Sequence, residues 1–159
     1  MSRESVVRPI YESIDDISNE ERLAEHLMLR WELDGWKRNP RMYPIDISFI
    51  KDDVIKGFAE IKCRTVSVDT YETYMISVSK VIAAQSLSKA TGLGCYLVVK
   101  WTDSLGWISF GSGEEAVDPR PGIIRPKFVA WGGRSDREDP QDMEPVIHFD
   151  IDDFRMDYL

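Results

Sequence analysis

Apolar residues recur at helical spacing in the first regular part of the chain. The repeat comprises Leu23, Ala24, Leu27, Met28 and Trp31. This spacing is typical of an amphipathic helix that packs one face against a core. Residues 18–21 have the pattern of a capping box, in which Ser18 and Glu21 bond the free N–H groups of the first turn. We therefore predict a helix that begins at Ser18, follows an N-terminal arm of residues 1–17, and ends at Gly35.

Two strand-like segments follow at residues 43–50 and 54–64, joined through Lys51-Asp52-Asp53. Both contain short apolar runs bounded by turn-forming residues, which is the usual pattern of strands. The hydroxyl-rich stretch from Thr65 to Tyr74 is predicted to be a loop.

A second helix is predicted from about Ser77 to Thr91, where Gly92 is suited to end it. The segment from Gly94 to Trp101 is almost continuously β-branched, aromatic or aliphatic. Such a run is typical of a central strand that is buried on both faces. The segment Trp107–Phe110 follows a short turn and is predicted to be its hairpin partner.

Glycine and proline residues punctuate the chain beyond Gly111, and two further strand-like segments follow at residues 127–131 and 145–149. We interpret them as an extra C-terminal pair of strands on the core, not as a second domain. The predicted fold is therefore one α/β domain over residues 1–159, with a mixed central sheet flanked by helices. Its core lies at residues 18–111 and its C-terminal extension at residues 112–159.

The composition, with 43% hydrophobic and 30% charged residues in a chain of 159, is that of an ordinary globular protein. No segment is apolar over the length of a membrane span, and the N-terminus lacks the apolar core of a signal peptide. We therefore expect a cytoplasmic protein with no membrane partner. Cys63 and Cys95 stand alone in strand-like runs and are predicted to be buried thiols. His26 and His148 are the only histidines, which leaves little for zinc chemistry.

The net charge of −8 disfavours nucleic-acid binding, because affinity for phosphates comes from lysine and arginine. The charges are unevenly distributed, however. Acidic residues concentrate between Asp136 and Asp157. Basic residues gather in three other places: Lys37, Arg38 and Arg41; Lys62 and Arg64; and residues 120–127. A local basic groove on an acidic protein is compatible with this distribution.

Asp46, Glu60 and Lys62 form the pattern D-x13-E-x-K across the two predicted strands. Mg²⁺ prefers oxygen ligands and keeps several waters, so two carboxylates and a substrate phosphate suffice to hold it. Lys62 shares a strand face with Glu60, because side chains alternate along a strand. There its amine can orient or deprotonate an attacking water, or neutralise charge on the phosphorus.

The same charged residues also fit a simpler reading, in which they form a solvated strand face and pair across the surface. Asp46 argues against that reading. It lies between Ile45 and Ile47, where an uncompensated carboxylate would be costly.

The geometry of the connecting turn decides whether the two carboxylates can meet. A two-residue turn at Asp52-Asp53 with regular pairing would place Asp46 opposite Ala59, and Glu60 on the other face of the sheet. A three-residue loop, or a β-bulge in either strand, would bring Asp46 and Glu60 to the same face. A shared site therefore predicts one of these two irregularities between residues 46 and 60.

Together, Pro44-Ile45-Asp46 and Glu60-Ile61-Lys62 resemble the two halves of the motif of the PD-(D/E)xK nuclease superfamily. The resemblance implies a restriction-endonuclease-like αβββαβ core and hydrolysis of DNA with Mg²⁺ or Mn²⁺. It also implies a main-chain ligand, the carbonyl of Ile61. A glutamate of the first helix often joins such a site, and Glu25 is the candidate by position, with Glu21 as the alternate. The loop at residues 132–142 resembles segments of phage-encoded proteins, which would place this protein in the cytoplasm of a host cell.

Lys80 and Gln85 on the second helix match positions where superfamily members contact the phosphate, although a surface lysine and a packed glutamine explain them equally well. The basic residues predicted to bind DNA are Lys37, Arg38, Arg41 and Arg64. The first strand of the core is reduced to residues 36–42, where Pro40 blocks an ordinary central strand. This departure leaves open a second reading, a member of the fold that no longer cuts and acts in binding or assembly. A third is an acidic module that docks a basic protein partner through its C-terminal region. The sequence leaves homodimer formation open.

Overall fold

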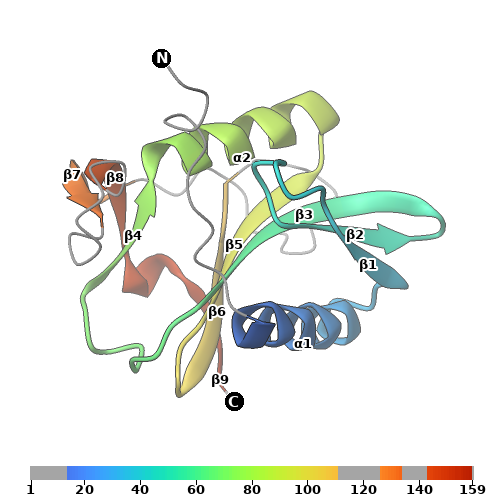
Figure 1. Ribbon diagram of the computed structural model, residues 1–159, viewed down its shortest axis with the longest axis horizontal. Helices are drawn as coiled ribbons and strands as arrows, with labels where there is room; N and C mark the ends of the chain where they lie inside the picture. The colour runs from blue at the N-terminus through green and yellow to red at the C-terminus, as the bar shows by residue number, and fades with distance from the viewer. Residues whose placement is uncertain (1–13, 111–125, 134–142, 159) are drawn as a thin grey trace.

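The computed structural model describes residues 14–110, 126–133 and 143–158, and Figure 1 shows their arrangement. The elements in chain order are α1 (Ile14–Arg30), β1 (Gly35–Arg38), β2 (Ile47–Lys51), β3 (Val54–Cys63), β4 (Thr73–Ser77), α2 (Val78–Thr91), β5 (Gly94–Lys100), β6 (Ser104–Ser109), β7 (Phe128–Gly133), β8 (Met143–Asp150), the 3-10 helix η3 (Ile151–Asp153) and β9 (Arg155–Tyr158). Within these ranges, no helix has the length and apolar character needed to cross a membrane.

The main sheet has the strand order β1-β2-β3-β5-β6-β9. β3 and β5 run parallel, and the other neighbouring strands are antiparallel. Helix α1 covers one face of this sheet and α2 the other (Figure 1). The predicted mixed sheet with flanking helices is thereby confirmed. β9 adds an edge strand that the sequence pattern had not indicated.

Two separate apolar clusters hold the helices to the sheet. On the α1 face, Leu23 and Leu27 pack with Phe49 and Tyr96. On the α2 face, Val81 and Ala84 pack with the opposite set of strand residues, which includes Phe58, Cys95 and Leu97. β5 contributes to both clusters and is buried along nearly its whole length, as its continuous apolar run predicted.

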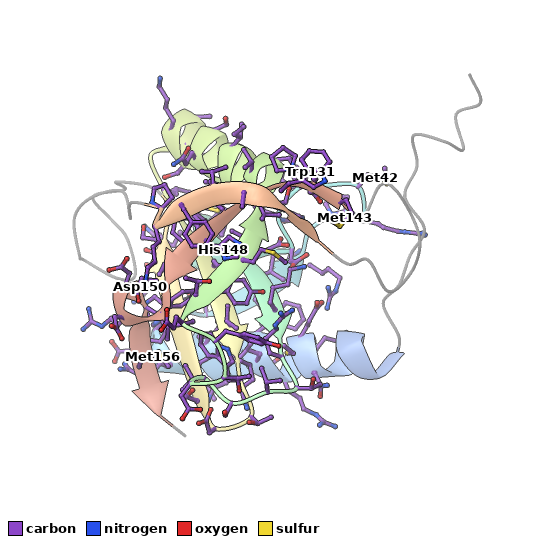
Figure 2. The ribbon with its side chains drawn as sticks, turned by 90° about the vertical axis from the view of Figure 1, so that its left-hand side faces the viewer. Met42, Trp131, Met143, His148, Asp150 and Met156 are labelled. Carbon is purple, nitrogen blue, oxygen red and sulfur yellow. The ribbon has the colours of Figure 1, made fainter. Side chains whose placement is uncertain are left out.

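A second sheet, of order β4-β8-β7, packs on the α2 side. The predicted C-terminal pair of strands corresponds to β7 and β8. The predicted loop from Thr65 to Tyr74 ends too late, because β4 begins at Thr73 and joins this sheet. Its side chains alternate between half-buried and buried, with Tyr74 and Ile76 directed into the core. Figure 2 shows the three strands, with His148 of β8 opposite Met75 of β4 and opposite Phe128 of β7.

Both predicted ends of the first helix were wrong. α1 begins at Ile14, so Ser18 lies within the helix and does not cap it. At the other end, the N–H of Leu33 donates to the carbonyl of Met28 at 2.8 Å, and Glu32 has a φ of 56°. A left-handed residue thus closes α1 three positions before Gly35.

Several predictions concern segments outside the described residues. These segments are most of the predicted N-terminal arm (residues 1–13), the part of the basic group at residues 120–125, and the acidic stretch at residues 136–142. Among the described residues, Cys95 is buried as predicted, whereas Cys63 is exposed. Cys63 is the last residue of β3, where the strand leaves the core.

Candidate active site

The turn between β2 and β3 is the two-residue type. Lys51 pairs with Val54, and Asp52 and Asp53 have φ values of 52° and 64°. Both turn residues are therefore left-handed, a conformation that aspartate tolerates better than most residues. The N–H of Asp52 also donates to the Asp34 carboxylate at 2.7 Å, which stabilises the turn from outside. The alternative of a three-residue loop was wrong.

The predicted β-bulge is present. Ile50 pairs with Ile55, but the next residue, Phe49, pairs with Gly57, so Lys56 is the extra residue. Beyond the bulge, Ile47 pairs with Ala59. One further step places Asp46, which directly precedes β2, beside Glu60. The bulge thus provides the shift of one residue that brings the two carboxylates together.

Asp46 is held in this place by the backbone on both sides. Its carboxylate oxygen Oδ2 accepts a hydrogen bond of 2.9 Å from the N–H of Ile61. Its own carbonyl accepts from the N–H of Asn39 at 2.8 Å. The Asn39 side chain in turn donates to the carbonyl of Ile45 and accepts from the hydroxyl of Ser48. The start of β2 is therefore fixed by polar contacts as well as by packing.

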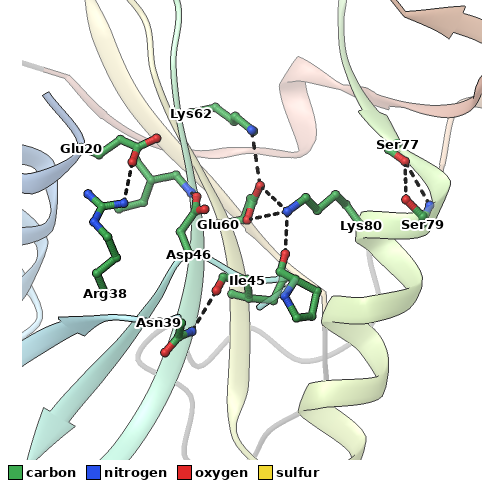
Figure 3. Close-up of polar contacts among 12 residues, drawn as sticks. Glu20, Arg38, Asn39, Ile45, Asp46, Glu60, Lys62, Ser77, Ser79 and Lys80 are labelled. Atoms are coloured by element: carbon green, nitrogen blue, oxygen red, sulfur yellow. Dashed lines mark hydrogen bonds and ion pairs between the residues drawn. The ribbon is translucent and has the colours of Figure 1, made fainter. Parts of the chain in front are cut away.

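Glu60 is a buried carboxylate at the centre of the group. Only 1% of its surface is exposed, and two ammonium groups approach its oxygen Oε2, Lys62 Nζ at 3.4 Å and Lys80 Nζ at 3.2 Å (Figure 3). Among the described atoms, Oε2 nevertheless has no hydrogen-bond partner. Burial raises the pKa of Glu60, and the nearby charge of Asp46 adds to this effect, while Lys62 and Lys80 oppose it.

Lys62 points into the same space from the same strand face. Its side chain is 43% exposed. Burial acts to lower the pKa of Lys62, but the negative charges of Glu60 and Asp46 oppose it and the pKa is raised. The side chain therefore carries its positive charge at neutral pH in this arrangement. Arg64 follows at the next position of the same alternation and lies over the ring of Tyr74, 5.4 Å from its centroid.

Lys80, in the first turn of α2, connects this helix with Pro44 and Glu60. The helix begins after Ser77, whose hydroxyl caps it by accepting from the N–H of Ser79. The Lys80 amine donates to the carbonyl of Pro44 at 2.6 Å and lies 3.4 Å from Oε1 of Glu60. Lys80 thus contacts Glu60 of the acidic pair, and its predicted role beside a phosphate stays a prediction. Gln85 is partly buried further along α2, and the structure shows no hydrogen bond from it to the described residues of this group.

The donor set fits a hard divalent cation. The carboxylates of Glu60 and Asp46 provide the oxygen ligands that Mg²⁺ and Mn²⁺ accept, and water can complete the coordination. Among the described residues, no group of three or more His, Cys, Asp or Glu side chains is placed to hold a metal. A metal here would therefore rest on two side chains and on main-chain or solvent oxygens, of which the carbonyl of Ile61 remains the predicted one.

The structure does not place Glu25 in the site. α1 covers the face of the sheet opposite Glu60, and the Glu25 carboxylate accepts a hydrogen bond of 3.0 Å from the indole of Trp36. Glu21 is exposed. The glutamate that α1 buries is Glu20, which forms an ion pair of 2.9 Å with Arg38 beside the Asp46 region (Figure 3). Sequence reasoning missed Glu20, although it continues the apolar stripe of Leu23 and Leu27 at helical spacing.

The predicted DNA-binding residues near β1 differ in how accessible their side chains are to a DNA strand. Arg38 is engaged by Glu20, and its side chain is 34% exposed. Lys37 and Arg41 are exposed, on β1 and in the turn after it. Their role stays a prediction.

A mixed sheet between two helices, with Asp46, Glu60 and Lys62 gathered where β2 and β3 pair, is the arrangement of a PD-(D/E)xK nuclease. Comparison with known proteins agrees. The family model described as "Phage putative PDDEXK endonuclease" matches residues 6–156, and the chain belongs to that family. Among solved structures, the chain is similar to Hjc, a Holliday junction resolvase from Archaeoglobus fulgidus. The TM-score is 0.44 at 14% identity, over 58% of this chain and 76% of the resolvase chain. No curated protein sequence matches the chain.

Proposed function

We propose that this protein is a Mg²⁺- or Mn²⁺-dependent endonuclease that hydrolyses phosphodiester bonds of DNA at Asp46, Glu60 and Lys62. The observation that carries the proposal is the buried oxygen Oε2 of Glu60, which lacks a hydrogen bond and lies within 3.4 Å of two ammonium groups. Packing alone does not favour such a carboxylate, because burying it costs free energy. A catalytic cation site gives a reason for its position.

Asp46 and Glu60 would hold the metal, with the carbonyl of Ile61 as a third ligand. A bound metal would supply a water of lowered pKa and would offset negative charge on the phosphate. The N–H of Ile61 keeps the Asp46 carboxylate oriented toward Glu60 before any ligand arrives. The two strands therefore preorganise the ligands through the bulge.

Lys62 would act as a positively charged donor. Its ammonium already lies 3.4 Å from Glu60 Oε2, so a water or phosphate oxygen bound beside Glu60 would be within its reach. From there it would hold the attacking water in place and stabilise negative charge that develops on the phosphate. Lys80 approaches the same carboxylate from α2 and would neutralise it from the other side.

The test uses closed circular plasmid, which has no ends and so reports endonucleolytic cutting, together with single-stranded DNA. Asp46→Asn, Glu60→Gln and Lys62→Ala should each lower the rate with Mn²⁺ by about 100-fold or more, because residues that act as one unit lose activity together. Asp153→Asn and Lys89→Ala are matched controls, since both residues are exposed and lie outside the site. Full activity of the Glu60→Gln protein would contradict the proposal. A folded wild-type protein that cuts neither DNA would favour the non-cutting member of the fold.

A further inference from the structure

A cavity of about 510 Å³ opens beyond the carboxyl ends of β3 and β5, against α1. Its lining includes Arg22 and His26 of α1, Cys63 and Arg64 at the end of β3, and Lys100 at the end of β5. The size is that of a small-molecule site. The carboxyl ends of neighbouring parallel strands are also where open α/β sheets bind ligands.

The lining of this cavity is basic, although the protein carries a net charge of −8. Among the described residues, two arginines, a lysine and a histidine contribute to it, and no aspartate or glutamate does. The nearby carboxylates of α1 are bonded elsewhere, Glu20 to Arg38 and Glu25 to Trp36. The local charge therefore favours an anionic ligand.

Part of the cavity wall is apolar. Leu23 of α1 and Leu105 of β6 contribute to the lining, between the basic groups. A cavity that combines cations with an apolar wall suits a nucleotide, because the phosphate meets the cations and the base meets the wall. Inorganic phosphate alone would leave the apolar part of the wall without a partner.

The carboxyl end of β3 connects the cavity with the candidate active site. Cys63 and Arg64 follow Glu60 by three and four residues, so the near edge of the lining is about 10–13 Å from Glu60 along the strand, at about 3.3 Å per residue. The α1 residues of the lining lie on the sheet face opposite Glu60, so a single strand with one phosphate at Glu60 would reach the cavity around the end of β3.

We propose that this cavity receives one unpaired nucleotide of the DNA strand that is cut, a short way along the strand from the scissile phosphate. This inference rests on the proposed nuclease function and adds a substrate class to it. A base within a duplex is stacked and paired and cannot enter a cavity unless it first leaves the stack, which costs a few kcal/mol. DNA that already contains unpaired nucleotides, such as a single strand, a flap or a bulge, avoids that cost.

The first measurement compares cleavage of a single strand with cleavage of the same sequence as a blunt duplex. The wild type should cut the single strand about tenfold faster, since contacts to one base are worth about 1–3 kcal/mol. In the Arg22→Ala, His26→Ala double variant this ratio should fall toward one. Both residues are exposed on α1, so the variant should fold. Lys89→Ala removes one positive charge from the last turn of α2 and should leave the ratio unchanged. A wild type that prefers the duplex, or a double variant with an unchanged ratio, would overturn the inference.

The second measurement does not need cleavage and separates this inference from the proposed function. Cys63 lines the cavity and is exposed, whereas Cys95 is buried and burial raises its pKa to about 12. N-Ethylmaleimide should therefore modify Cys63 first. Tetrathymidylate should slow that modification severalfold in both the wild type and the inactive Glu60→Gln protein, and less in the Arg22→Ala, His26→Ala protein.

The matched ligand is the same tetranucleotide without bases. Weaker protection by this abasic chain supports a pocket for the nucleotide base. Equal protection by both ligands, or none by either, refutes such a pocket. Protection by tetrathymidylate in a wild type that cuts no DNA would retain the pocket and reject only the nuclease function.

Discussion

Glu60→Gln should make the metal-free protein more stable while it abolishes the metal response. Glu60 is 1% exposed, and its two cationic neighbours, Lys62 and Lys80, are 43% and 34% exposed at their side chains. Solvent screens those ion pairs, so each contributes at most about 1 kcal/mol. Against this stands the desolvation of an ionised carboxylate, which costs several kcal/mol.

The balance favours the neutral amide. We expect Glu60→Gln to raise the free energy of unfolding by about 1 kcal/mol at pH 7, which corresponds to a rise of about 2–4 °C in Tm for a chain of this length. The change removes a charge but little volume, so the packing beside Leu97 of β5, which pairs with Glu60, should persist. Glu21→Gln is the matched control, because Glu21 is exposed on α1 and should shift Tm very little.

The stability gain should depend on pH in one direction. Burial raises the pKa of Glu60 above its ordinary value of 4.5, so the folded protein binds this proton more tightly than the unfolded chain. The wild type therefore loses stability as pH rises from about 4.5 through the folded pKa. The advantage of Glu60→Gln should be absent near pH 4 and complete above the folded pKa.

Adding Mn²⁺ should make the wild type more stable than Glu60→Gln. At Mn²⁺ tenfold above its dissociation constant, the wild type gains about 1.4 kcal/mol by mass action, and Glu60→Gln should gain none. Thermal unfolding of both proteins between pH 4 and 8, with and without MnCl₂, measures all three effects. A loss of 3–5 kcal/mol in the variant would show that ion pairing outweighs desolvation. Equal Mn²⁺ shifts in the two proteins would remove Glu60 from the metal site.

Two further predictions address the elements that frame the site. Lys80→Met should lower the free energy of unfolding by about 1 kcal/mol, because Glu60 then keeps one cationic neighbour, whereas the control Lys89→Met should have little effect; urea unfolding measures both. Gly94→Ala should destabilise the fold by about 1–3 kcal/mol, because its Cβ would lie 2.4 Å from the hydroxyl of fully buried Tyr96. The control Gly35→Ala, with nothing within 4 Å of its Cβ, should unfold close to the wild-type urea concentration, and an equal loss in both variants would contradict the packing at β5.

The β2–β3 hairpin shows how far local pattern can carry a site prediction. Parity required either a three-residue loop or a bulge if Asp46 and Glu60 were to share a face. The structure uses the bulge, with Lys56 as the extra residue. The residue type of Lys56 does not identify it as the bulge residue, because the position of a bulge depends on how the whole hairpin pairs. The two aspartates in the turn were also a weak signal, since their positive φ values depend on support from Asp34.

The errors elsewhere arise where a residue's partner is distant in sequence. β4 lies at Thr73–Ser77 because β8, some 70 positions later, pairs with it. A local reading of this hydroxyl-rich stretch does not reveal that partner. The choice of Glu25, with Glu21 as the alternate, has the same origin, because the residues that contact Glu25 and Glu20 lie on β1. The indole of Trp36 in β1 donates a hydrogen bond to Glu25, and the guanidinium of Arg38 in β1 donates one to Glu20.

The exposure of the two lysines explains how a buried carboxylate can remain available to a cation. In the protein without metal, Lys62 and Lys80 offset part of the charge of Glu60. Because both side chains reach solvent, moving either amine away costs at most about 1 kcal/mol. A fully buried partner would cost 3–5 kcal/mol to remove and would compete with the metal. In the proposed metal site, partial exposure of the lysines would therefore offset part of the charge of Glu60 and still let a metal ion reach its carboxylate.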